Sequence, residues 1–380
     1  MSYKASEIRW YKEDTPGVIP ADPENYLIAT AEAYSLAQNY PTETIQTLGA
    51  GGEASPKIEG TPSYEGSLTL VLTSDLFPLI LIHGIGDATM TDPHVGPWQA
   101  DTAVVEGEYY SHSDGVHTLY CKVAGTTGST EPDLTTADEY DEIDDNGVIW
   151  IVRDLMGKYT GSRSDCLSTF GIEMMFTGGG CGQPVEFIRE RFGGCRINTL
   201  SFGKSGDDTG FRSEVGIVAM SGDDDQSNPN YPDQGGVDIP LSKRFLGTCD
   251  LEVFIDDVKV VNTTSVSVDI NRNITTDKGV NCGDNVTQIG VIDIPGTITC
   301  LMDKETYLRS ADRQVHNLKL VYTDNGDTCI IEFPQVKFDR VAPTVDPTRF
   351  VTLDSTFSAF GDSATPSVQY TIITDIRYGI

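Results

Sequence analysis

The sequence predicts an all-β protein with a short helix: a sandwich or barrel of two packed sheets, plus a small inserted β domain. Apolar and polar residues alternate with a period of two over many segments, which is typical of strands with one packed face and one wet face. Turn-forming residues separate these segments, and the chain contains 38 glycines. Its 380 residues suffice for one large domain or two ordinary ones with a packed core.

The charge of the chain limits its partners. Acidic residues number 57 and basic residues 26, which gives a formal net charge of −31 at pH 7. Such a surface repels phosphate groups over roughly 8 Å at physiological salt. We therefore expect no tight binding of nucleic acid, although nucleic acid can pass nearby without being held. Solubility alone is the simpler explanation of the charge.

Apolar runs and cysteines predict a chain made in the cytoplasm. No apolar run reaches the roughly 20 residues that span a bilayer, and the first residues lack the basic and apolar parts of a signal peptide. The eight cysteines form no C-x-x-C pair. This spacing favours buried free thiols over zinc or redox motifs, with disulfides as the alternative if the protein matures outside the cell.

The N-terminal residues 2–24 are predicted to form an irregular arm, because prolines interrupt it. Trp10 and Tyr11 in this arm are candidates for contacts with a neighbouring molecule. A first strand is expected to begin at Tyr26.

Residues 39–66 are rich in glycine and proline, and compact domains seldom keep such a long loop without a use for it. Residues 49–54 fit a loose dinucleotide-binding pattern. They lack the preceding hydrophobic strand and the following helix that such a site requires. We therefore predict a mobile contact loop.

A strand is predicted around Leu68, Leu70 and Leu72, followed by a short helix over residues 75–83. Ser74 is the predicted N-cap and Gly84 the predicted end of this helix. The apolar residues of the helix are expected to cover one open face of the sheet. We interpret His83 as a residue of the helix C-terminus and not as a catalyst.

Residues 99–153 have a different character, with three predicted short strands at 104–110, 118–123 and 148–152 around a polar, turn-rich middle. The segment resembles a small β module that occurs in phage tail and other virion proteins. The matching residues are Tyr120, Cys121, Ala124, Gly125, Thr126, Thr127, Gly128, Glu131, Pro132, Gly147, Val148 and Trp150. Asn146 replaces the aspartate of the module.

The stretch from residue 245 to 334 reads as successive amphipathic strands around which the rest is arranged. An Asp256-Asp257 turn joins two of them, and Val266, Val268 and Ile270 alternate with polar residues in the next. Asn325-Gly326 is a strong hairpin signal. Further strands are predicted at 168–176, 196–202, 215–220, 292–300, 350–357 and 368–374.

The order of these segments resembles the tail tube proteins of long-tailed bacteriophages. The matching segments are 168–173, 196–202, 266–273, 290–298 and 331–336. Each motif is degenerate, so the resemblance depends on their order. It covers residues 1–98 and about 154–380, and it implies a tail-tube domain in two parts with residues 99–153 inserted between them.

The resemblance implies a structural subunit that has no catalytic residues, no cofactor and no membrane contact. Six copies would form a ring by joining sheets edge to edge around a channel, and the rings would stack. The long loop and the N-terminal arm would bridge between rings. DNA would pass through without specific binding. The implied partners are other copies of the chain, the tape measure protein and the tail terminator and tip proteins, in a virion tail assembled in the host cytoplasm.

Acidic residues on wet strand faces suit such a conduit, because a channel for DNA must avoid holding phosphates. The candidates for lumen or edge positions are Glu252, Asp256, Asp257, Asp269 and Asp293, each of which is also explained as an ordinary solvated residue. The candidates for contacts between rings are Thr47, Gly49, Gly51, Gly52 and Lys57.

Motifs for chemistry are weak in this sequence. His112, His117 and Cys121 lack the spacing of a zinc site, and the acidic stretches 141–147 and 223–225 lack the pattern of an EF-hand loop. The chain contains no G-x-S-x-G motif. We therefore expect neither a metal site nor an enzyme.

Two alternatives remain open. The first is a virion or extracellular adhesin that binds carbohydrate through Tyr109, Tyr110, Tyr120 or Trp150, all of which are also explained as core residues. The second is an acidic secreted hydrolase. Its support, three glycosylation-like sequences at Asn262, Asn273 and Asn285, is weak without a signal peptide.

Overall fold

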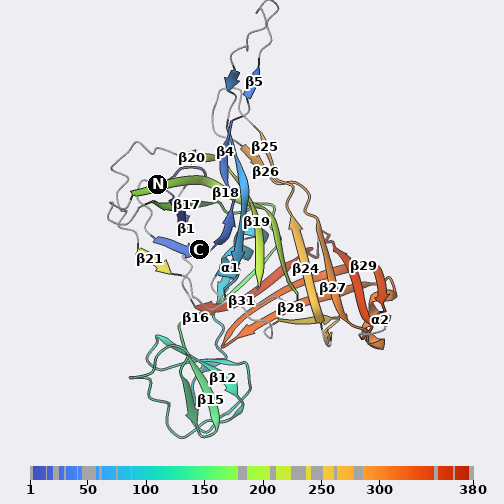
Figure 1. Cartoon of the computed structure of the whole chain (residues 1–380). Helices are drawn as coiled ribbons and strands as arrows, with labels where there is room; N and C mark the ends of the chain where they lie inside the picture. The colour runs from blue at the N-terminus through green and yellow to red at the C-terminus, as the bar shows by residue number, and fades with distance from the viewer. Residues whose placement is uncertain are drawn as a thin grey trace, which may run out of the picture.

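The computed structural model describes residues 3–13, 15–19, 25–29, 31–40, 42–44, 57–59, 62–73, 76–86, 88–178, 186–205, 211–223, 237–240, 251–260, 263–277, 286–345, 350–362 and 364–375. Most of its strands belong to one twenty-stranded arrangement that folds into two layers (Figure 1). The predicted all-β fold is confirmed, as a sandwich whose described strands do not close into a barrel.

The first layer contains the N-terminal strand and its neighbours. Its members are β1 (Tyr3–Lys12), β2 (Asn25–Ala29), β17 (Phe170–Gly178), β20 (Ser221–Asp223), β21 (Val237–Pro240) and the first half of β18 (Glu186–Ser205). The strands β2 and β21 pair in parallel, and the other pairs in this layer are antiparallel.

The second layer is larger. Its early members are β3 (Ala31–Tyr34), β4 (Ala37–Asn39), β7 (Ser63–Val71), β8 (Ala88–Thr91), β16 (Met156–Ser162) and β19 (Arg212–Ala219). Its late members are β22 (Leu251–Ile255), β23 (Val258–Lys259), β24 (Thr263–Asn271), β27 (Ile294–Leu301), β28 (Val315–Asp324), β29 (Asp327–Thr344), β30 (Thr352–Ala359) and β31 (Gln369–Asp375).

The strand β18 belongs to both layers. Its first half pairs with β17, and its second half pairs with β19 and β24. The change of layer occurs at Gly193 and Gly194, where Gly194 has a φ of +64° that side chains rarely adopt. A Cβ atom on Gly194 would lie 2.7 Å from Cβ of Met220. Gly193 and Gly194 therefore form the bend that joins the two sheets.

A buried carboxylate supports this bend. Glu13 accepts a hydrogen bond from the backbone N of Gly194 at 2.6 Å and from the backbone N of Gly17 at 3.3 Å. Burial raises the pKa of Glu13, and these hydrogen bonds oppose the rise. The residues after β1 are thus attached to the layer crossing.

The helix α1 (Leu76–Ile85) lies inside the main core and contacts β16, β18 and β31. Nine of its ten residues are buried. The helix therefore has no solvent-exposed face, as expected for a helix that is apolar all round. The predicted end at Gly84 is wrong, because the helix continues to Ile85. Thr73 Oγ1 accepts from the backbone N of Leu76 at 3.1 Å, and the predicted cap Ser74 lies outside the described residues.

The C-terminal end of α1 is bound by Arg272, which is 1% exposed. Its Nε donates to the carbonyl of Gly84 at 2.9 Å, Nη1 donates to the carbonyl of Ser164 at 2.9 Å, and Nη2 donates to the carbonyl of Ile85. Burial lowers the pKa of Arg272 to about 10, so the group still carries its charge at neutral pH. A cation at this position stabilises the negative end of the helix dipole.

A second helix, α2 (Lys304–Ala311), was not predicted from the sequence. Asp303 caps it by accepting from the backbone N of Glu305 and of Thr306, both at 2.9 Å. The helix is short and polar, and it packs against β29.

Two separate two-stranded ribbons occur in segments that join strands of the second layer. The first is β5 (Thr42–Thr44) with β6 (Lys57–Glu59), and the second is β25 (Thr275–Asp277) with β26 (Val286–Gln288). The β5–β6 ribbon projects from the body, and β25 and β26 lie at the same end (Figure 1). The predicted loop 39–66 therefore contains a ribbon, and Ala37–Asn39 and Ser63–Val71 belong to strands.

A small separate unit lies at the other end of the body (Figure 1). Its five-stranded sheet consists of β9 (Gly96–Pro97), β11 (Tyr109–Ser111), β12 (His117–Val123), β14 (Glu142–Asp145) and β15 (Val148–Asp154). The pair β10 (Ala103–Val104) and β13 (Gly125–Thr126) completes it. The single strand predicted over 104–110 is wrong, since Val104 and Tyr109 lie in different strands. The sheet includes residues 96–97 and 154, whereas a division at 99 and 153 stays a prediction.

Two residues of the module, Gly128 and Trp150, donate hydrogen bonds to Asp145. Its Oδ2 accepts from Nε1 of Trp98 at 3.0 Å and from Nε1 of Trp150 at 3.1 Å, and its Oδ1 accepts from the backbone N of Gly128 at 2.7 Å. A Cβ atom on Gly128 would lie 2.5 Å from this carboxylate. Asn146 occupies the left-handed region with a φ of +57°, which asparagine tolerates. Its place in the turn before β15 is therefore compatible with the module.

Several predicted strands and turns are confirmed. Asp256 and Asp257 both have positive φ in the turn between β22 and β23, and Asn325 and Gly326 both have positive φ in the turn between β28 and β29. The predicted irregular arm is wrong for Tyr3–Lys12, which forms β1 and pairs with β2 and β17. In the described part of the chain, no helix is long and apolar enough to cross a membrane.

Five cysteines in the described ranges are free thiols, as predicted. Cys121, Cys195, Cys300 and Cys329 are buried, and Cys166 is exposed. Burial raises the pKa of the buried thiols, to about 11 for Cys121 and Cys300. The other three cysteines lie outside the described residues.

Candidate interaction surfaces

The outward side of the second layer carries small and polar side chains over six neighbouring strands. Cross-strand register places Thr69 of β7 opposite Glu214 of β19. Glu214 lies opposite Ser201 of β18, which in turn lies opposite Asp269 of β24. We call this surface the polar face, and its residues are Ser67, Thr69, Thr199, Ser201, Glu214, Gly216, Ser267, Asp269, Asn271, Thr297 and Thr356.

The alternation of these strands fixes the direction of the polar face. The residues between its members point into the main core, as do Phe202, Val215, Val268 and Ile298, which are all buried. The strands therefore keep one side packed and the other side wet. The alternation in β7, β24 and β27 was predicted from the sequence, but the predominance of Ser and Thr on the wet side of six neighbouring strands was not.

Charge on the polar face is mainly negative. Glu214 and Asp269 are exposed, and the structure gives neither of them a salt bridge to another described residue. Arg212, at the margin of this face, is paired with Glu32 through Nε and Oε2 at 2.9 Å. Asp293 is exposed at the start of β27, where its backbone forms a bridge with Asn271. Two of the five predicted acids, Asp269 and Asp293, thus lie on or beside the polar face.

The other three predicted acids lie elsewhere, near α2, and each has a basic partner. Glu252 of β22 contacts Nζ of Lys259, and Asp257 accepts from Nζ of Lys319 at 2.8 Å. Asp256 accepts from the backbone N of Asn317 at 2.9 Å. These carboxylates are largely compensated locally, so they add little to a negative surface.

His316 completes the cluster around Asp256. Its Nδ1 lies 2.7 Å from Oδ2 of Asp256, and its Nε2 lies 2.8 Å from Oδ1 of Asp312. Burial of the ring acts to lower its pKa, but the hydrogen bonds to both carboxylates outweigh burial and raise the pKa of His316. Burial likewise opposes the charge of Asp256, whose hydrogen bonds to Asn317 and His316 lower its pKa overall.

The second layer has strand edges that are open within the described residues. The strands β3 and β4 pair with β7 on one side only. At the other end of the layer β22 pairs with β28 and with the two-residue strand β23. Open edges of this kind expose backbone N–H and C=O groups that can pair with another chain.

The residues predicted to make contacts between neighbouring molecules are placed as follows. Lys57 begins β6 and pairs with Thr44 of β5. The other loop candidates, Thr47, Gly49, Gly51 and Gly52, lie outside the described residues.

Trp10 and Tyr11 are only 2% and 3% exposed. Trp10 stacks on Phe170 with ring centroids 4.6 Å apart, and Tyr11 Oη donates to the carbonyl of Phe192 at 3.2 Å. Both rings are packed within their own chain. A contact of these rings with a neighbouring copy stays a prediction that their burial does not support.

The aromatic residues proposed for carbohydrate binding are mainly structural. Tyr109, Tyr110 and Trp150 are buried, at 5%, 8% and 0% exposure, and Tyr120 is partly exposed. Tyr110 packs edge-on against Trp150 in the core of the small unit. The burial of Tyr109, Tyr110 and Trp150 therefore argues against carbohydrate binding by these three rings.

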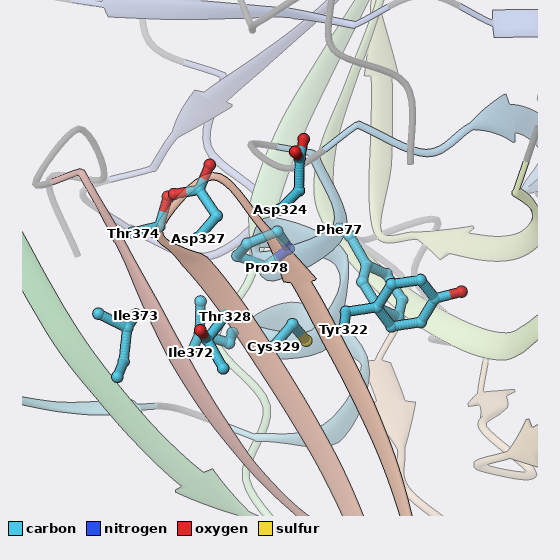
Figure 2. Close-up of a pocket in the computed structure, with 10 residues that line it drawn as sticks. All are labelled: Phe77, Pro78, Tyr322, Asp324, Asp327, Thr328, Cys329, Ile372, Ile373 and Thr374. Carbon is cyan, nitrogen blue, oxygen red and sulfur yellow. The ribbon is translucent and has the colours of Figure 1, made fainter. Parts of the chain in front are cut away.

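Two cavities found in the described part are small. One of about 10 Å³ lies between α1, β28, β29 and β31, where Phe77, Pro78, Tyr322 and Asp327 are among its lining residues (Figure 2). Another of about 60 Å³ lies beside α2. Sites for small molecules are usually roughly 300 Å³ or more. Among the described residues, no group of three or more histidine, cysteine, aspartate or glutamate side chains is arranged to hold a metal ion.

Comparison with known proteins adds one finding. A family model described as "Phage tail tube protein" matches residues 4–367, which is nearly the whole chain. A search of curated proteins gave no match.

Proposed function

Because the chain belongs to the phage tail tube protein family and is a structural component of a phage tail, we propose that it forms stacked hexameric rings whose channel conducts DNA during genome ejection. The polar face carries this proposal. Six strands present hydroxyl groups, glycine and carboxylates side by side. Such a wall holds few cations that would bind phosphates, so DNA can slide along it without being held.

The ring is proposed to close through the open strand edges. We assign the β3–β4 edge of one copy to the β22–β23 edge of the next, because these edges end the second layer on opposite sides. Pairing them around a ring removes these two open edges of the layer, and the edge at β8, which among the described strands pairs only with β16, stays open. In this arrangement Glu252, Asp256 and Asp257 lie at a subunit boundary, and Asp269 and Asp293 face the lumen.

Contacts between rings are proposed to use the β5–β6 ribbon. A two-stranded ribbon is at best marginally stable alone in water, and this one projects from the body (Figure 1). A neighbouring ring would supply the missing packing. The residues assigned to this contact are Thr47, Gly49, Gly51, Gly52 and Lys57.

The other partners follow from the same role. The tube assembles with further tail proteins, and we propose that these include the tape measure protein along the lumen and the terminator and tip proteins at the ends. Assembly in the host cytoplasm is part of this proposal. Residues 99–153 are proposed to be a module inserted into the tube domain, which consists of residues 1–98 and 154–380.

Electron microscopy of the purified chain tests the proposal. We expect rings or tubes with sixfold symmetry and a continuous channel, formed at high protein concentration. A variant with proline at Gln38 in β4 serves as a comparison, because the amide of Gln38 alternates with those that face β7 and proline cannot donate the hydrogen bond of a paired edge. Monomers alone at every concentration would contradict the proposal.

A further inference from the structure

The small unit shares a polar interface with the body that is built around a buried guanidinium. Arg153 of β15 is 0% exposed. Its Nη2 donates to Oδ1 of Asp327 at 2.9 Å, and its Nη1 donates to the carbonyl of Asn325 at 2.8 Å. Both partners belong to the β28–β29 hairpin of the body. A charged group is buried here only because carboxylate and carbonyl oxygens replace water around it.

Residues of the small unit complete the surroundings of this guanidinium. Its Nε donates to Oε1 of Glu139 at 3.3 Å, and its central carbon lies 4.5 Å from the ring centroid of Tyr140. The guanidinium is thus shared between two parts of the molecule. Arg153 therefore acts as a clamp between the small unit and the hairpin turn.

A second contact lies beside the first. Tyr109 Oη donates to the carbonyl of Gly326 at 2.7 Å and lies 3.2 Å from Oγ1 of Thr328. A Cβ atom on Gly326 would lie 3.2 Å from the ring of Tyr120 and 3.3 Å from Nη1 of Arg153. The turn between β28 and β29 thus closes a hairpin and also receives the small unit. Figure 2 shows Asp324 and Asp327 at this end of the hairpin, next to Pro78 of α1.

A third contact fixes the two places where the chain passes between the parts. Thr118 is 0% exposed, and its Oγ1 accepts from the backbone N of Met156, the first residue of β16. The same oxygen lies 2.9 Å from Nε2 of His94, which precedes β9. One hydroxyl therefore joins the entry and the exit of the small unit.

We propose that the small unit is docked rigidly on the body through the Arg153 clamp. It therefore projects at a fixed angle, unlike a domain that is joined to the body only by flexible linkers. Under the proposed tube function, on which this step depends, each ring would display its units at fixed positions. Any partner that binds several units at once would meet a regular array, whose spacing the tube sets.

Hydrogen exchange of the full chain tests the docking. In the wild type, we expect slow exchange at the amides of 94–96, 155–157 and 325–328. Arg153→Met should speed exchange there by about 100-fold, because it removes the cation that pairs with the buried carboxylate of Asp327. Strands of the main core such as β17 and β27 should change less than about twofold.

Matched variants keep the test decisive. Lys122→Met breaks an exposed ion pair with Glu142 in the same unit and should change exchange less than about twofold. Tyr109→Phe and Asp327→Asn are milder changes at the interface, and they decide the question if Arg153→Met does not fold. Fast exchange at the junction in the wild type, or equal effects of Arg153→Met and Lys122→Met, would overturn the proposal.

The result is separable from the proposed tube function, because exchange is measured on the unassembled chain. If tubes do not form, the exchange pattern still decides the docking. If tubes form, electron density for residues 96–154 should be as well defined as that for β24 and β27. Density that is averaged out for the small unit alone would contradict rigid docking and leave the tube function intact.

Discussion

Nδ1 of His316 lies 2.7 Å from Oδ2 of Asp256, and on the opposite side of the ring Nε2 faces Asp312 at 2.8 Å. Carboxylates only accept hydrogen bonds, so both ring nitrogens donate and the imidazole carries a positive charge. Asp256 lies in the turn between β22 and β23, and Asp312 is the C-cap of α2. A charged ring therefore holds α2 to the hairpin at the edge of the second layer.

This cluster predicts a pH dependence of stability. The pKa of His316 is raised in the folded protein, so its stabilisation is complete below the unfolded pKa of about 6.5 and is lost as pH rises through the folded pKa. Relative to a His316→Gln variant, the wild type should lose unfolding free energy on this rise. Urea unfolding of both proteins between pH 6 and 9 measures the difference. A difference in unfolding free energy between the two proteins that stays constant from pH 6 to pH 9 would contradict the prediction.

Asp256, the acidic group of the same cluster, predicts the opposite dependence of stability on pH. The hydrogen bonds around Asp256 lower its pKa although burial opposes its charge, so its stabilisation is present above the unfolded pKa of about 3.9 and is lost as pH falls through the folded pKa. Nη1 of Arg309 lies 3.4 Å from Oδ2 of Asp256. The difference between wild type and His316→Gln should therefore be largest at mildly acidic to neutral pH.

Arg272 is predicted to be essential for the end of α1. Arg272→Met removes the guanidinium that donates to the carbonyls of Gly84, Ile85 and Ser164, and leaves the carbonyl of Ile85 with only the backbone N of Ser164 as a donor; this should cost about 4 kcal/mol of unfolding free energy. Arg212→Met is the control, because its ion pair with Glu32 is exposed and should contribute less than about 1 kcal/mol. Denaturant unfolding monitored by fluorescence compares them. Similar losses in both variants would contradict the role of Arg272.

The bend of β18 is predicted to require glycine at residue 194. Gly194→Ala combines a positive φ with a Cβ atom 2.7 Å from Met220 and should destabilise by about 3 kcal/mol. Gly147→Ala has a similar positive φ but open space around its Cβ, so about 1 kcal/mol is expected. The difference between the two midpoints of thermal unfolding isolates the steric part. Equal losses of stability in the two variants would contradict a steric requirement for glycine at residue 194.

Charge reversal on the polar face is predicted to affect DNA passage more than assembly. Asp269→Lys together with Glu214→Lys puts cations on a face that we assign to the lumen, and these would hold phosphates and slow ejection by about tenfold or more at low salt. The effect should shrink as salt rises. Fluorescence of DNA released from phage carrying the variant tube measures the rate. The exposed pair Glu142→Lys and Asp144→Lys in the small unit is the control, and an equal slowing there would argue against a lumenal position.

Local patterns predicted much of this fold. The turns at Asp256-Asp257 and Asn325-Gly326 and the alternation of Val266, Val268 and Ile270 involve neighbours only a few positions apart, and all are present in the structure. The strand β1 escaped prediction because residues 8–11 are buried on both of its sides. Ile8 and Trp10 face the main core, and Arg9 and Tyr11 are buried on the other side, so no simple period of two marks it.

The candidate surfaces were predicted less completely. Asp269 and Asp293 lie on or beside the polar face, but Glu252, Asp256 and Asp257 belong to a local network with basic partners. A sequence shows which residues are acidic, but it does not show which cation lies across a neighbouring strand. The helix α2 escaped prediction for a similar reason, because its single clear signal is the cap at Asp303.

The sequence by itself determined the strand content, the hairpin turns, the acidity and the polar character of one side of the strands, because these depend on residues close together along the chain. Only the tertiary structure decided that β18 joins two layers, that Arg272 binds the end of α1 and that Arg153 joins the small unit to the body. Arg272 and Gly84 are 188 positions apart, and Arg153 and Asp327 are 174 apart. Such pairs form only when packing excludes water around them, and no local pattern encodes that.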